Sequence, residues 1–395
     1  MSEKVFTSCT NAGPVSVYVK DGKVVRIRPL VAEDKDFKPW TIEAGGKKYS
    51  PPKKFALAPY VHADRRRIYS EDRIQYPMKR VDFDPKGERN PQNRGKSPYV
   101  RITWDEALDI VAGEIKRIKD GYGGSAITGL TSSHHNWGIV GYKMGPFARF
   151  MNLLEYTPVL DNPDSWEGWH WGATHTYGFY WRLGMPEQYD LLQDALQNAE
   201  MIVLWSNDPD STRGTYTGQE SSLWRQWLKE KGVEMVFIDP FHNYTAAAME
   251  GKWIAPRIGT DTCVAMAIAY VWITEGLYDK EYVKNRTIGF EEFKPYILGE
   301  VDGKPKTPEW AEQESGVKAR VIRALARQWA AKRTILSGGA RGGEGGACRQ
   351  AYGTEWARMM VLLQGMQGLG KPGRSIWGTT MGAPSDFETW FPAYA

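Results

Sequence analysis

The clearest pattern of apolar and polar positions lies in the middle of the chain. An apolar run at residues 201–205 is followed by a stretch with helical spacing at 220–231 and by a second apolar run at 233–238. Short continuous apolar runs are typical of strands buried on both faces, and the succession indicates a β-α-β unit with parallel strands. A further strand is expected at 334–336, before a glycine-rich segment and a helix that extends to about Met366.

The N-terminal part has other patterns. Residues 15–19 and 23–27 alternate around Asp21-Gly22, which predicts a hairpin with a two-residue turn. Residues 42–92 are rich in Pro, Lys, Arg and Asp and predict long loops and extended segments. Thr103 is placed to cap a helix whose Glu106 completes a capping box, with apolar positions at helical spacing up to 118 and a strand at 126–130 beyond.

These patterns predict an α/β fold with mostly parallel, nucleotide-binding-like sheets, flanking helices and a small N-terminal β unit. In such folds, ligands bind beyond the carboxyl ends of the strands, where the strand order reverses. We therefore expect the functional residues in the loops that follow the strands.

Composition narrows the class of protein. The 395 residues are enough for two or three domains, and a net charge of +4 from 51 basic and 47 acidic residues favours neither nucleic acid nor a membrane surface as partner. Arg65-Arg66-Arg67 is a tight basic run, interpreted as a solvated turn or as a contact with an anionic cofactor or partner. The first residues resemble no secretory signal, and no apolar run approaches 18 residues, so we expect a cytoplasmic protein without a membrane span.

Cysteine and tryptophan usage adds two expectations. Cys9, Cys263 and Cys348 are odd in number and far apart, which fits neither a disulfide framework nor chelating spacing and indicates a reducing compartment. Of the 17 tryptophans, many fall between residues 137 and 227. Indoles at this density suit a pocket for a planar ligand, although structural packing is the alternative for each of them.

Polar residues follow the predicted strands. Ser206-Asn207-Asp208 ends the first apolar run, and Asp239 ends the second at the place where dinucleotide-binding folds hold ribose hydroxyls. An Asp before Pro that initiates a turn accounts equally well for Asp208 and Asp239. Helix capping accounts for the polar residues of Gly259-Thr260-Asp261, and a functional contact is the alternative.

Two further motifs admit two interpretations each. The segment from Ser337 to Gly346 can form a pyrophosphate cradle or a tight structural turn, and it matches neither a Walker A motif nor GxGxxG well. His134 and His135 are adjacent and therefore cannot both easily bind one metal ion. We expect one of them in acid-base chemistry, because imidazole titrates near neutral pH.

The densest chemistry lies between Asp161 and Gly172. This segment holds a carboxylate, a hydroxyl, an imidazole and three indoles within a dozen residues. The Gly-x-Ser-x-Gly pattern of a hydrolase is missing around Ser165. A serine oxygen can also bind a hard, high-valent metal, an interpretation that these residues leave open.

These motifs resemble the transhydroxylase branch of the dimethylsulfoxide reductase family of molybdopterin enzymes. The resemblance runs through Gly13-Pro14-Val15, Ser132 to Tyr142, Asn162 to Gly172, Glu187 to Asp190, Gly259 to Asp261 and Gly346 to Arg349. It implies a molybdenum or tungsten ion held by two molybdopterin guanine dinucleotides, with Ser165 as the protein ligand. It also implies that His134 and Asp164 exchange protons with a bound phenol in a pocket that Tyr142, Trp166 and Tyr394 line. The segments that correspond to cofactor-binding residues are Trp205, Ser206, Asn207 and Asp208, then Asp239, and then Gly259, Thr260 and Asp261.

The resemblance implies an activity and a partner. The activity is a hydroxyl transfer that converts pyrogallol to phloroglucinol; the alternatives are a reductive catechol dehydroxylase or other molybdopterin oxidoreductase, and a truncated, non-catalytic fragment. Because Cys9 stands alone where many members have four cysteines, we expect no iron-sulfur cluster here and an iron-sulfur small subunit as partner. Glu344 replaces a tryptophan of the family pattern, which could alter substrate choice.

The resemblance also implies a division into domains. Residues 1–75 form a β-rich domain, residues 76–155 with 335–395 an α/β domain around the metal site, and residues 156–334 an α/β domain that binds a dinucleotide cofactor. Because the family's large subunits continue beyond the position of Ala395, we expect the C-terminal domain to be missing from this sequence.

Overall fold

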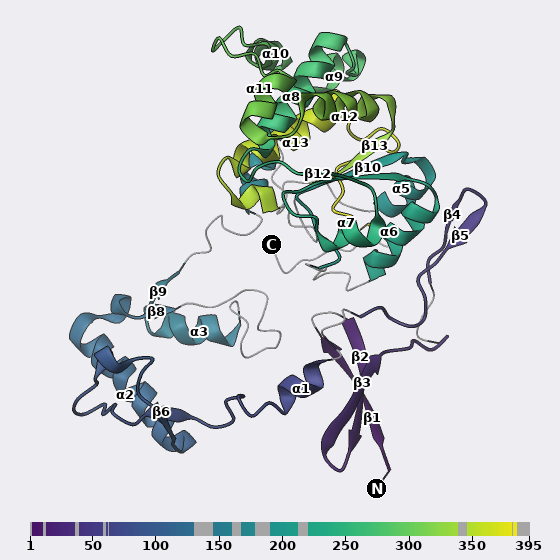
Figure 1. The fold of residues 1–395 in the computed structure, drawn as a ribbon. Coiled ribbons are helices and arrows are strands. Elements are labelled where there is room, and N and C mark those ends of the chain that lie inside the picture. Colours follow the sequence, from purple (N-terminus) through teal and green to yellow (C-terminus); the bar gives the residue numbers. More distant parts are fainter. Residues whose placement is uncertain are drawn as a thin grey trace. The chain divides into compact units, whose positions relative to one another are not determined.

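A computed structural model describes residues 2–10, 13–35, 39–57, 61, 63–129, 145–159, 167–177, 190–211, 220–338, 346–380 and 382–384. Its chain divides into two compact units (Figure 1). One joins residues 1–65 to residues 162–395, and the other comprises residues 66–161. The three-domain division expected from the sequence stays a prediction.

A four-stranded parallel sheet lies at the centre of the first unit. Its strands are β10 (Met201–Trp205), β11 (Glu234–Ile238), β12 (Lys252–Ile254) and β13 (Thr334–Gly338), in the order β12-β11-β10-β13. The chain moves outward from β10 through β11 to β12, and β13 then pairs with the opposite edge of β10. The strand order therefore reverses between β10 and β13, and the predicted α/β class is confirmed.

Both faces of the sheet are covered, so β10 and β13 are buried along their whole length. Ile202 and Leu204 belong to one apolar core, which includes residues of α5 (Leu191–Asn198), α6 (Glu220–Glu230) and α7 (Tyr244–Met249). Val203 and Trp205 belong to the core on the other face. Successive side chains of β10 point alternately into two apolar cores. Because both faces are buried, the strand sequence is continuously apolar and does not alternate with polar residues.

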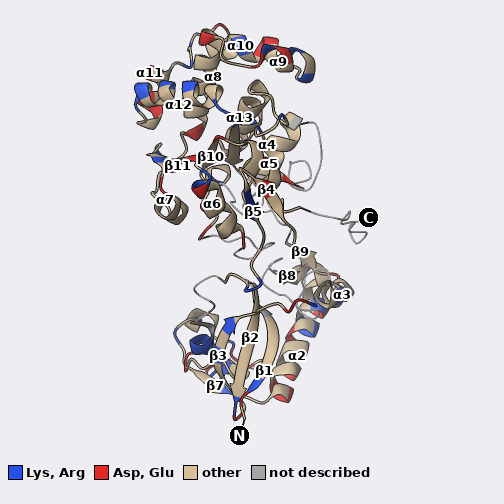
Figure 2. Ribbon diagram, turned by 90° about the vertical axis from the view of Figure 1, so that its right-hand side faces the viewer, with Lys and Arg blue, Asp and Glu red and all other residues tan. Residues whose placement is uncertain are grey.

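A group of helices connects β12 to β13. These are α8 (Asp261–Glu275), α9 (Lys280–Arg286), α10 (Phe290–Leu298), α11 (Pro308–Ser315) and α12 (Ala319–Ala331). α8 is the most buried of them. The apolar face of α12, which includes Ile322 and Trp329, packs into the core that also contains Val203 and Trp205. Figure 2 marks charged residues along the outer helices, whereas the sequences of β10 and β13 contain none.

Two helices pack closely together in the core that contains Val203 and Trp205. α4 (Glu167–Tyr177) packs against α13 (Gly353–Met366). A Cβ atom on Gly168 would lie 2.2 Å from the carbonyl oxygen of Cys348, and one on Gly172 would lie 2.3 Å from that of Thr354. The close approach of α4 to Cys348, just before α13, and to α13 itself therefore requires glycine at both positions.

The N-terminal part of this unit contains two small sheets. β1 (Lys4–Thr10), β2 (Gly13–Lys20) and β3 (Lys23–Pro29) form an antiparallel sheet, and the turn at Asp21-Gly22 has φ values of 51° and 74°. The predicted hairpin is confirmed. β4 (Ile42–Ala44) and β5 (Lys47–Tyr49) pair where long loops were expected, because Tyr49 is buried against Trp227 of α6. The short helix α1 (Asp64–Ile68) follows.

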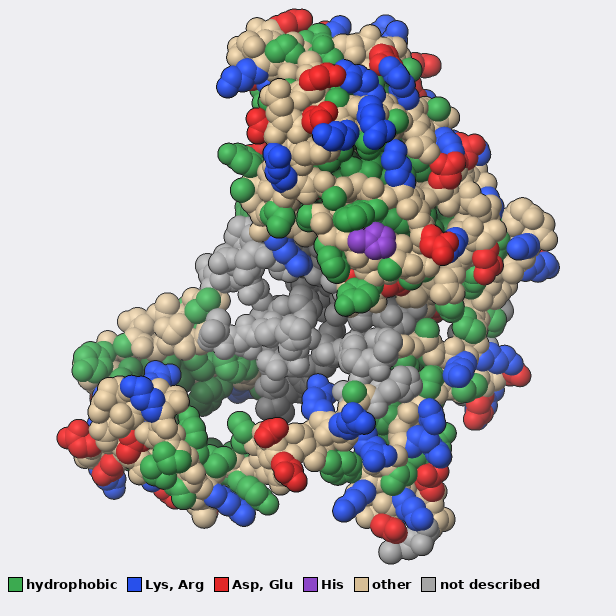
Figure 3. All heavy atoms as spheres, in the orientation of Figure 1, with side chains coloured by type: hydrophobic (Ala, Val, Ile, Leu, Met, Phe, Trp, Pro, Cys, Tyr) green, Lys and Arg blue, Asp and Glu red, His purple; other side chains and the backbone are tan. Residues whose placement is uncertain are grey.

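The second unit contains α2 (Trp104–Tyr122), α3 (Pro146–Leu153) and the strand pairs β6–β7 (Met78–Arg80, Tyr99–Arg101) and β8–β9 (Thr128–Gly129, Thr157–Pro158). Thr103 caps α2 as predicted, since its hydroxyl accepts a hydrogen bond from the Glu106 amide at 3.1 Å. The Glu106 carboxylate pairs with Lys79 at 2.9 Å. α2 has no buried residue, and apolar side chains lie at the surface of this unit (Figure 3).

Candidate functional site

The loops that follow β10 and β13 are joined at the reversal of strand order. Ser206, the first residue after β10, has a φ of 53°, a value that costs energy for a residue other than glycine and is often found at functional sites. Its hydroxyl accepts a hydrogen bond from the Ala347 amide at 2.7 Å, and its carbonyl oxygen accepts one from the Gly346 amide at 2.8 Å. Ser206 thus fixes the end of the glycine-rich segment beside β10.

Asn207 also joins the loop after β10 to the end of β13, and its side-chain oxygen has no hydrogen-bond donor among the described residues. Its side-chain amide donates hydrogen bonds to the Ser337 hydroxyl at 2.5 Å and to the Ser337 carbonyl oxygen at 3.3 Å. The residue is 1% exposed, and its Oδ1 atom accepts no hydrogen bond from the part of the chain that the structure describes. A buried acceptor without a donor costs about 1–3 kcal/mol, so this oxygen is suited to receive a donor from a ligand.

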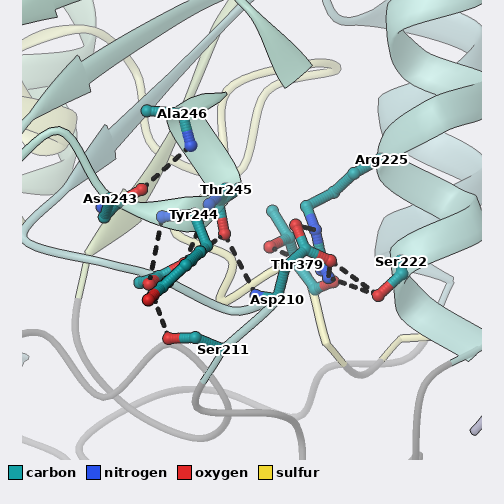
Figure 4. Close-up of polar contacts among 10 residues, drawn as sticks. Asp210, Ser211, Ser222, Arg225, Asn243, Tyr244, Thr245, Ala246 and Thr379 are labelled. Atoms are coloured by element: carbon teal, nitrogen blue, oxygen red, sulfur yellow. Dashed lines mark hydrogen bonds and ion pairs between the residues drawn. The ribbon is translucent and has the colours of Figure 1, made fainter. Parts of the chain in front are cut away.

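The acidic residues after β10 hold the loop in place (Figure 4). Asp208 accepts hydrogen bonds from the amide and the hydroxyl of Thr245 at 2.9 and 2.7 Å, and from the Ser211 hydroxyl at 2.5 Å. These contacts tie the loop to the N-terminus of α7. Asp208 therefore has a structural use besides the nucleotide contact expected from the sequence.

Asp210 forms a buried ion pair in the same loop. Arg225 of α6, 1% exposed, reaches the two oxygens of this carboxylate at 2.6 and 3.1 Å and donates to the carbonyl oxygen of Thr379 at 2.9 Å (Figure 4). Burial opposes the ionisation of Asp210, but the charge of Arg225 and the hydrogen bonds outweigh it and hold the pKa below its ordinary value. The pair anchors residues 208–211 to the body of the unit.

Asp239 follows β11 and is half-buried. It accepts hydrogen bonds from the Phe241 amide at 2.9 Å and from the side chain of Asn243 at 3.3 Å. Burial raises the pKa of Asp239 despite these bonds, and the charges of Asp261 and Asp208 act in the same direction. Asp261 and Asp208 therefore both disfavour the charged form of Asp239.

Asp261 is the first residue of α8 and is 2% exposed. Its two oxygens accept hydrogen bonds from the indole of Trp205 at 2.9 Å and from the side-chain amide of Gln350 at 2.6 Å. Gln350 in turn accepts a hydrogen bond from the Gly259 amide at 2.7 Å. These bonds lower the pKa of Asp261 less than burial raises it.

The capping explanation for Thr260 and Asp261 is wrong. Thr260 occupies the N-cap position of α8 without a side-chain capping bond, and its hydroxyl donates to the Arg257 carbonyl oxygen at 2.6 Å. Asp261 uses both oxygens on Trp205 and Gln350, far from it in sequence. The Gly259–Asp261 turn is therefore shaped by contacts with β10 and with the segment after the glycine-rich loop.

The site also contains residues to which the sequence analysis gave no individual role. Ser337 is a polar residue at the end of an apolar strand, a position that could have indicated a role. Gln350, Thr245 and Arg225 have no such local signal, because each acts through a partner more than 14 residues away.

Six predicted site residues lie outside the described residues: His134, Tyr142, Asp164, Ser165, Trp166 and Tyr394. Within the described ranges, no three His, Cys, Asp or Glu side chains are grouped to bind a metal ion. Cys263 and Cys348 form no disulfide bond within the described residues. None of the described helices is long and apolar enough to cross a membrane.

Two family models match the chain. The model described as pyrogallol hydroxytransferase large subunit-like, domain 1, matches residues 13–67, and the model described as molybdopterin oxidoreductase matches residues 73–383. The chain therefore belongs to the molybdopterin oxidoreductase family, which confirms the resemblance read from its motifs. Membership implies a molybdopterin cofactor with its metal.

Individual relatives refine this placement. The chain is 56% identical to the pyrogallol hydroxytransferase large subunit of Pelobacter acidigallici, over 99% of this chain and 46% of that one. It is 34% identical to the dimethyl sulfoxide/trimethylamine N-oxide reductase of Rhodobacter capsulatus, over 78% of this chain and 37% of the reductase. The chain thus spans less than half the length of either relative.

A solved structure shares the fold. Acetylene hydratase from Pelobacter acetylenicus superposes with a TM-score of 0.57 and 20% identity, covering 88% of this chain and 44% of the hydratase. At this identity the likeness concerns the fold and not the reaction.

The described residues fit a nucleotide-bearing cofactor. Asn207 Oδ1 is an acceptor without a donor, and the carboxylates of Asp239 and Asp261 can accept further hydrogen bonds from base N–H groups or ribose hydroxyls. Neither aspartate forms an ion pair with a described Lys or Arg. The acceptors lie beyond the carboxyl ends of parallel strands, where such folds bind nucleotides.

Proposed function

We propose that this protein transfers a hydroxyl group between polyhydroxylated benzenes and converts pyrogallol to phloroglucinol. The observation that carries the proposal is the 56% identity to a pyrogallol hydroxytransferase large subunit, which extends over 99% of this chain. The molybdopterin family membership and the nucleotide-type acceptors after β10, β11 and β12 support it. The conversion is an isomerisation and therefore needs no net electrons.

The cofactor we propose is molybdenum or tungsten with two molybdopterin guanine dinucleotides, and with Ser165 as the protein ligand. Asn207, Asp239 and Asp261 are proposed to accept hydrogen bonds from a guanosine part, and Ser206 to hold the glycine-rich segment near the pyrophosphate. When bound, the metal supplies a Lewis acid for a phenolate oxygen. We propose no iron-sulfur cluster in this chain.

Side chains of this chain are proposed to carry out the proton transfers. His134 is proposed to take the phenolic proton, because imidazole titrates near neutral pH. Asp164 is proposed to give a proton to the ring, which requires burial to raise the pKa of this carboxyl. Tyr142, Trp166 and Tyr394 are proposed to line the pocket and exclude water.

Variants at two positions test these roles. In the metal-loaded enzyme, Asp164→Asn and His134→Phe should each reduce the conversion of pyrogallol by about 100-fold or more, a typical effect of losing an acid or a base. Product formation and metal content are measured together. Asp109→Asn, on the exposed side of α2, is the matched control and should leave turnover unchanged. Unchanged turnover in fully loaded Asp164 and His134 variants would contradict the assignment.

A second candidate is a reductive activity, such as catechol dehydroxylation. The 34% identity to a dimethyl sulfoxide/trimethylamine N-oxide reductase favours it. A reductase consumes two electrons in each turnover, whereas the isomerisation consumes none, so a strict requirement for an added reductant would identify the reductase. If the 395-residue chain purifies without metal or nucleotide while a longer form contains both, the chain is a non-catalytic fragment.

The proposed partner is an iron-sulfur small subunit, and the proposed location is the cytoplasm. The relative from Pelobacter acidigallici is named as a large subunit, which supports a partner of this kind. Co-purification of a second chain with stoichiometric iron would support the partner.

A further inference from the structure

Buried tryptophans in the first unit differ in the use of the indole N–H. Trp272, in α8, donates to the carbonyl oxygen of Ala326 at 2.7 Å. Trp169 and Trp356 are 0% and 1% exposed, and neither N–H has an acceptor among the described residues. A buried donor without an acceptor is costly, and buried tryptophans usually find a partner for the indole. These two N–H groups therefore need an explanation.

The two indoles lie against each other near the candidate site. Their ring centroids are 5.8 Å apart with an interplanar angle of 62°. The Cζ2 atom of Trp356 lies 3.6 Å from the position that a Cβ on Gly338 would take. Because Cζ2 is on the same edge of the ring as Nε1, the N–H edge lies beside the end of β13. Gly338 is the last residue of β13 and lies within the glycine-rich segment from Ser337 to Gly346.

The surrounding helices fix the orientation of these rings. Trp169 belongs to the first turn of α4, four residues after Ser165, and Trp356 belongs to the first turn of α13. The glycine contacts described above hold α4 against the start of α13, which leaves little room for the rings to turn. The donors are thus held in place before any ligand arrives, as is usual for binding groups.

We propose that Trp356 and Trp169 donate hydrogen bonds to anionic atoms of the bound molybdopterin cofactor. The inference rests on the proposed cofactor and assigns it two donors that complement the acceptors Asn207, Asp239 and Asp261. An anionic acceptor suits a fixed indole N–H because charge-assisted hydrogen bonds are the stronger ones. The acceptor is a pyrophosphate oxygen or a dithiolene sulfur, which share this negative charge.

A matched pair of variants tests the proposal in the full-length holoenzyme. Trp356→Phe keeps an aromatic ring and removes the N–H. It should speed the loss of cofactor by about tenfold or more, measured as guanine nucleotide retained per chain over time. It should also lower the melting temperature of the loaded protein more than that of the cofactor-free protein. Trp272→Phe, the control, should lower both melting temperatures equally and leave retention unchanged.

The metal-to-sulfur charge-transfer absorption separates the two acceptors. A shifted band in Trp356→Phe assigns the hydrogen bond to a dithiolene sulfur, and an unshifted band with faster nucleotide loss assigns it to a phosphate oxygen. If Trp356→Phe does not fold, Trp169→Phe takes its place. Ultraviolet resonance Raman spectra of the wild-type protein need no variant and should show stronger indole hydrogen bonding after loading.

Three results would overturn the inference. These are normal cofactor retention in Trp356→Phe, equal destabilisation of its loaded and free forms, and an indole Raman signature that loading leaves unchanged. Each is distinguishable from failure of the proposed function, in which the wild-type holoenzyme itself would lack guanine nucleotide or would not convert pyrogallol.

Discussion

Acidic side chains in the two units have opposite surroundings. On α2, Glu114 accepts hydrogen bonds from Arg89 and Arg117, and these bonds lower its pKa to about 2. At the carboxyl end of the parallel sheet, Asp261 is buried and Asp239 half-buried, and burial raises the pKa of both. No described Lys or Arg forms an ion pair with either aspartate.

The difference indicates what each group of acids contributes. A carboxylate bonded to arginines at the surface adds a little stability and needs no ligand. A buried carboxylate without a cation costs stability, and such groups are concentrated at functional sites. Asn207, directly after β10, and Trp356, beside Gly338 of β13, follow the same rule, and Trp169 packs against Trp356. The first unit therefore contains the binding chemistry among the described residues.

The largest expected effect concerns Asp210, whose ion pair with Arg225 is buried. Arg225→Met should lower the free energy of unfolding by about 3–5 kcal/mol, because it leaves Asp210 buried without its cation. Chemical denaturation of the cofactor-free protein measures the loss. Adding Asp210→Asn to Arg225→Met should recover a large part of it. If the double variant is no more stable than Arg225→Met, the loss comes from packing and not from an unpaired charge.

The strands of the site could be predicted from the sequence because their environment is uniform. β10 and β13 are buried along their whole length and β11 is buried from Met235 onward, so the central positions of all three strands are apolar and polar residues are found only at or near their ends. The Asp21-Gly22 turn and the Thr103 cap were also predictable, because local backbone geometry determines the residue types that they require.

The remaining parts depend on contacts that are distant in sequence. Gln350 bridges Gly259 and Asp261 across about 90 residues, and nothing next to it in the chain indicates this role. β4 and β5 form because Trp40 and Tyr49 pack on Trp227. The apolar pattern of α2 predicted a helix correctly, but periodicity does not say what covers its apolar face.

A smaller effect concerns pH and should have opposite signs in the two units. Asp261 has a raised pKa, so its ionisation in the folded protein removes stability as pH rises from about 4 through the raised value. Asp261→Asn should therefore gain stability relative to the wild type over that range. Glu114 has a lowered pKa, so its contribution is present above about 4.5 and is lost as pH falls toward about 2.

The variant Glu114→Gln should accordingly be less stable than the wild type by about 1 kcal/mol or less at neutral pH. This deficit should shrink as the pH falls below 4.5. Denaturation of cofactor-free proteins across the pH range measures both variants. The quantity to compare is the difference in free energy of unfolding between each variant and the wild type, plotted against pH. If this difference changes in the same direction for Asp261→Asn and Glu114→Gln, the two acids do not respond to pH in opposite ways and the comparison is wrong.

The most direct measurement is the content of metal and guanine nucleotide in the purified full-length protein. If the unpaired acceptors and donors at the sheet's carboxyl end serve a molybdopterin guanine dinucleotide cofactor, each chain should contain one molybdenum or tungsten ion and two guanine nucleotides. Asp261→Asn should reduce the nucleotide content, whereas Glu114→Gln should not. A catalytically active protein with neither metal nor guanine nucleotide would contradict the account.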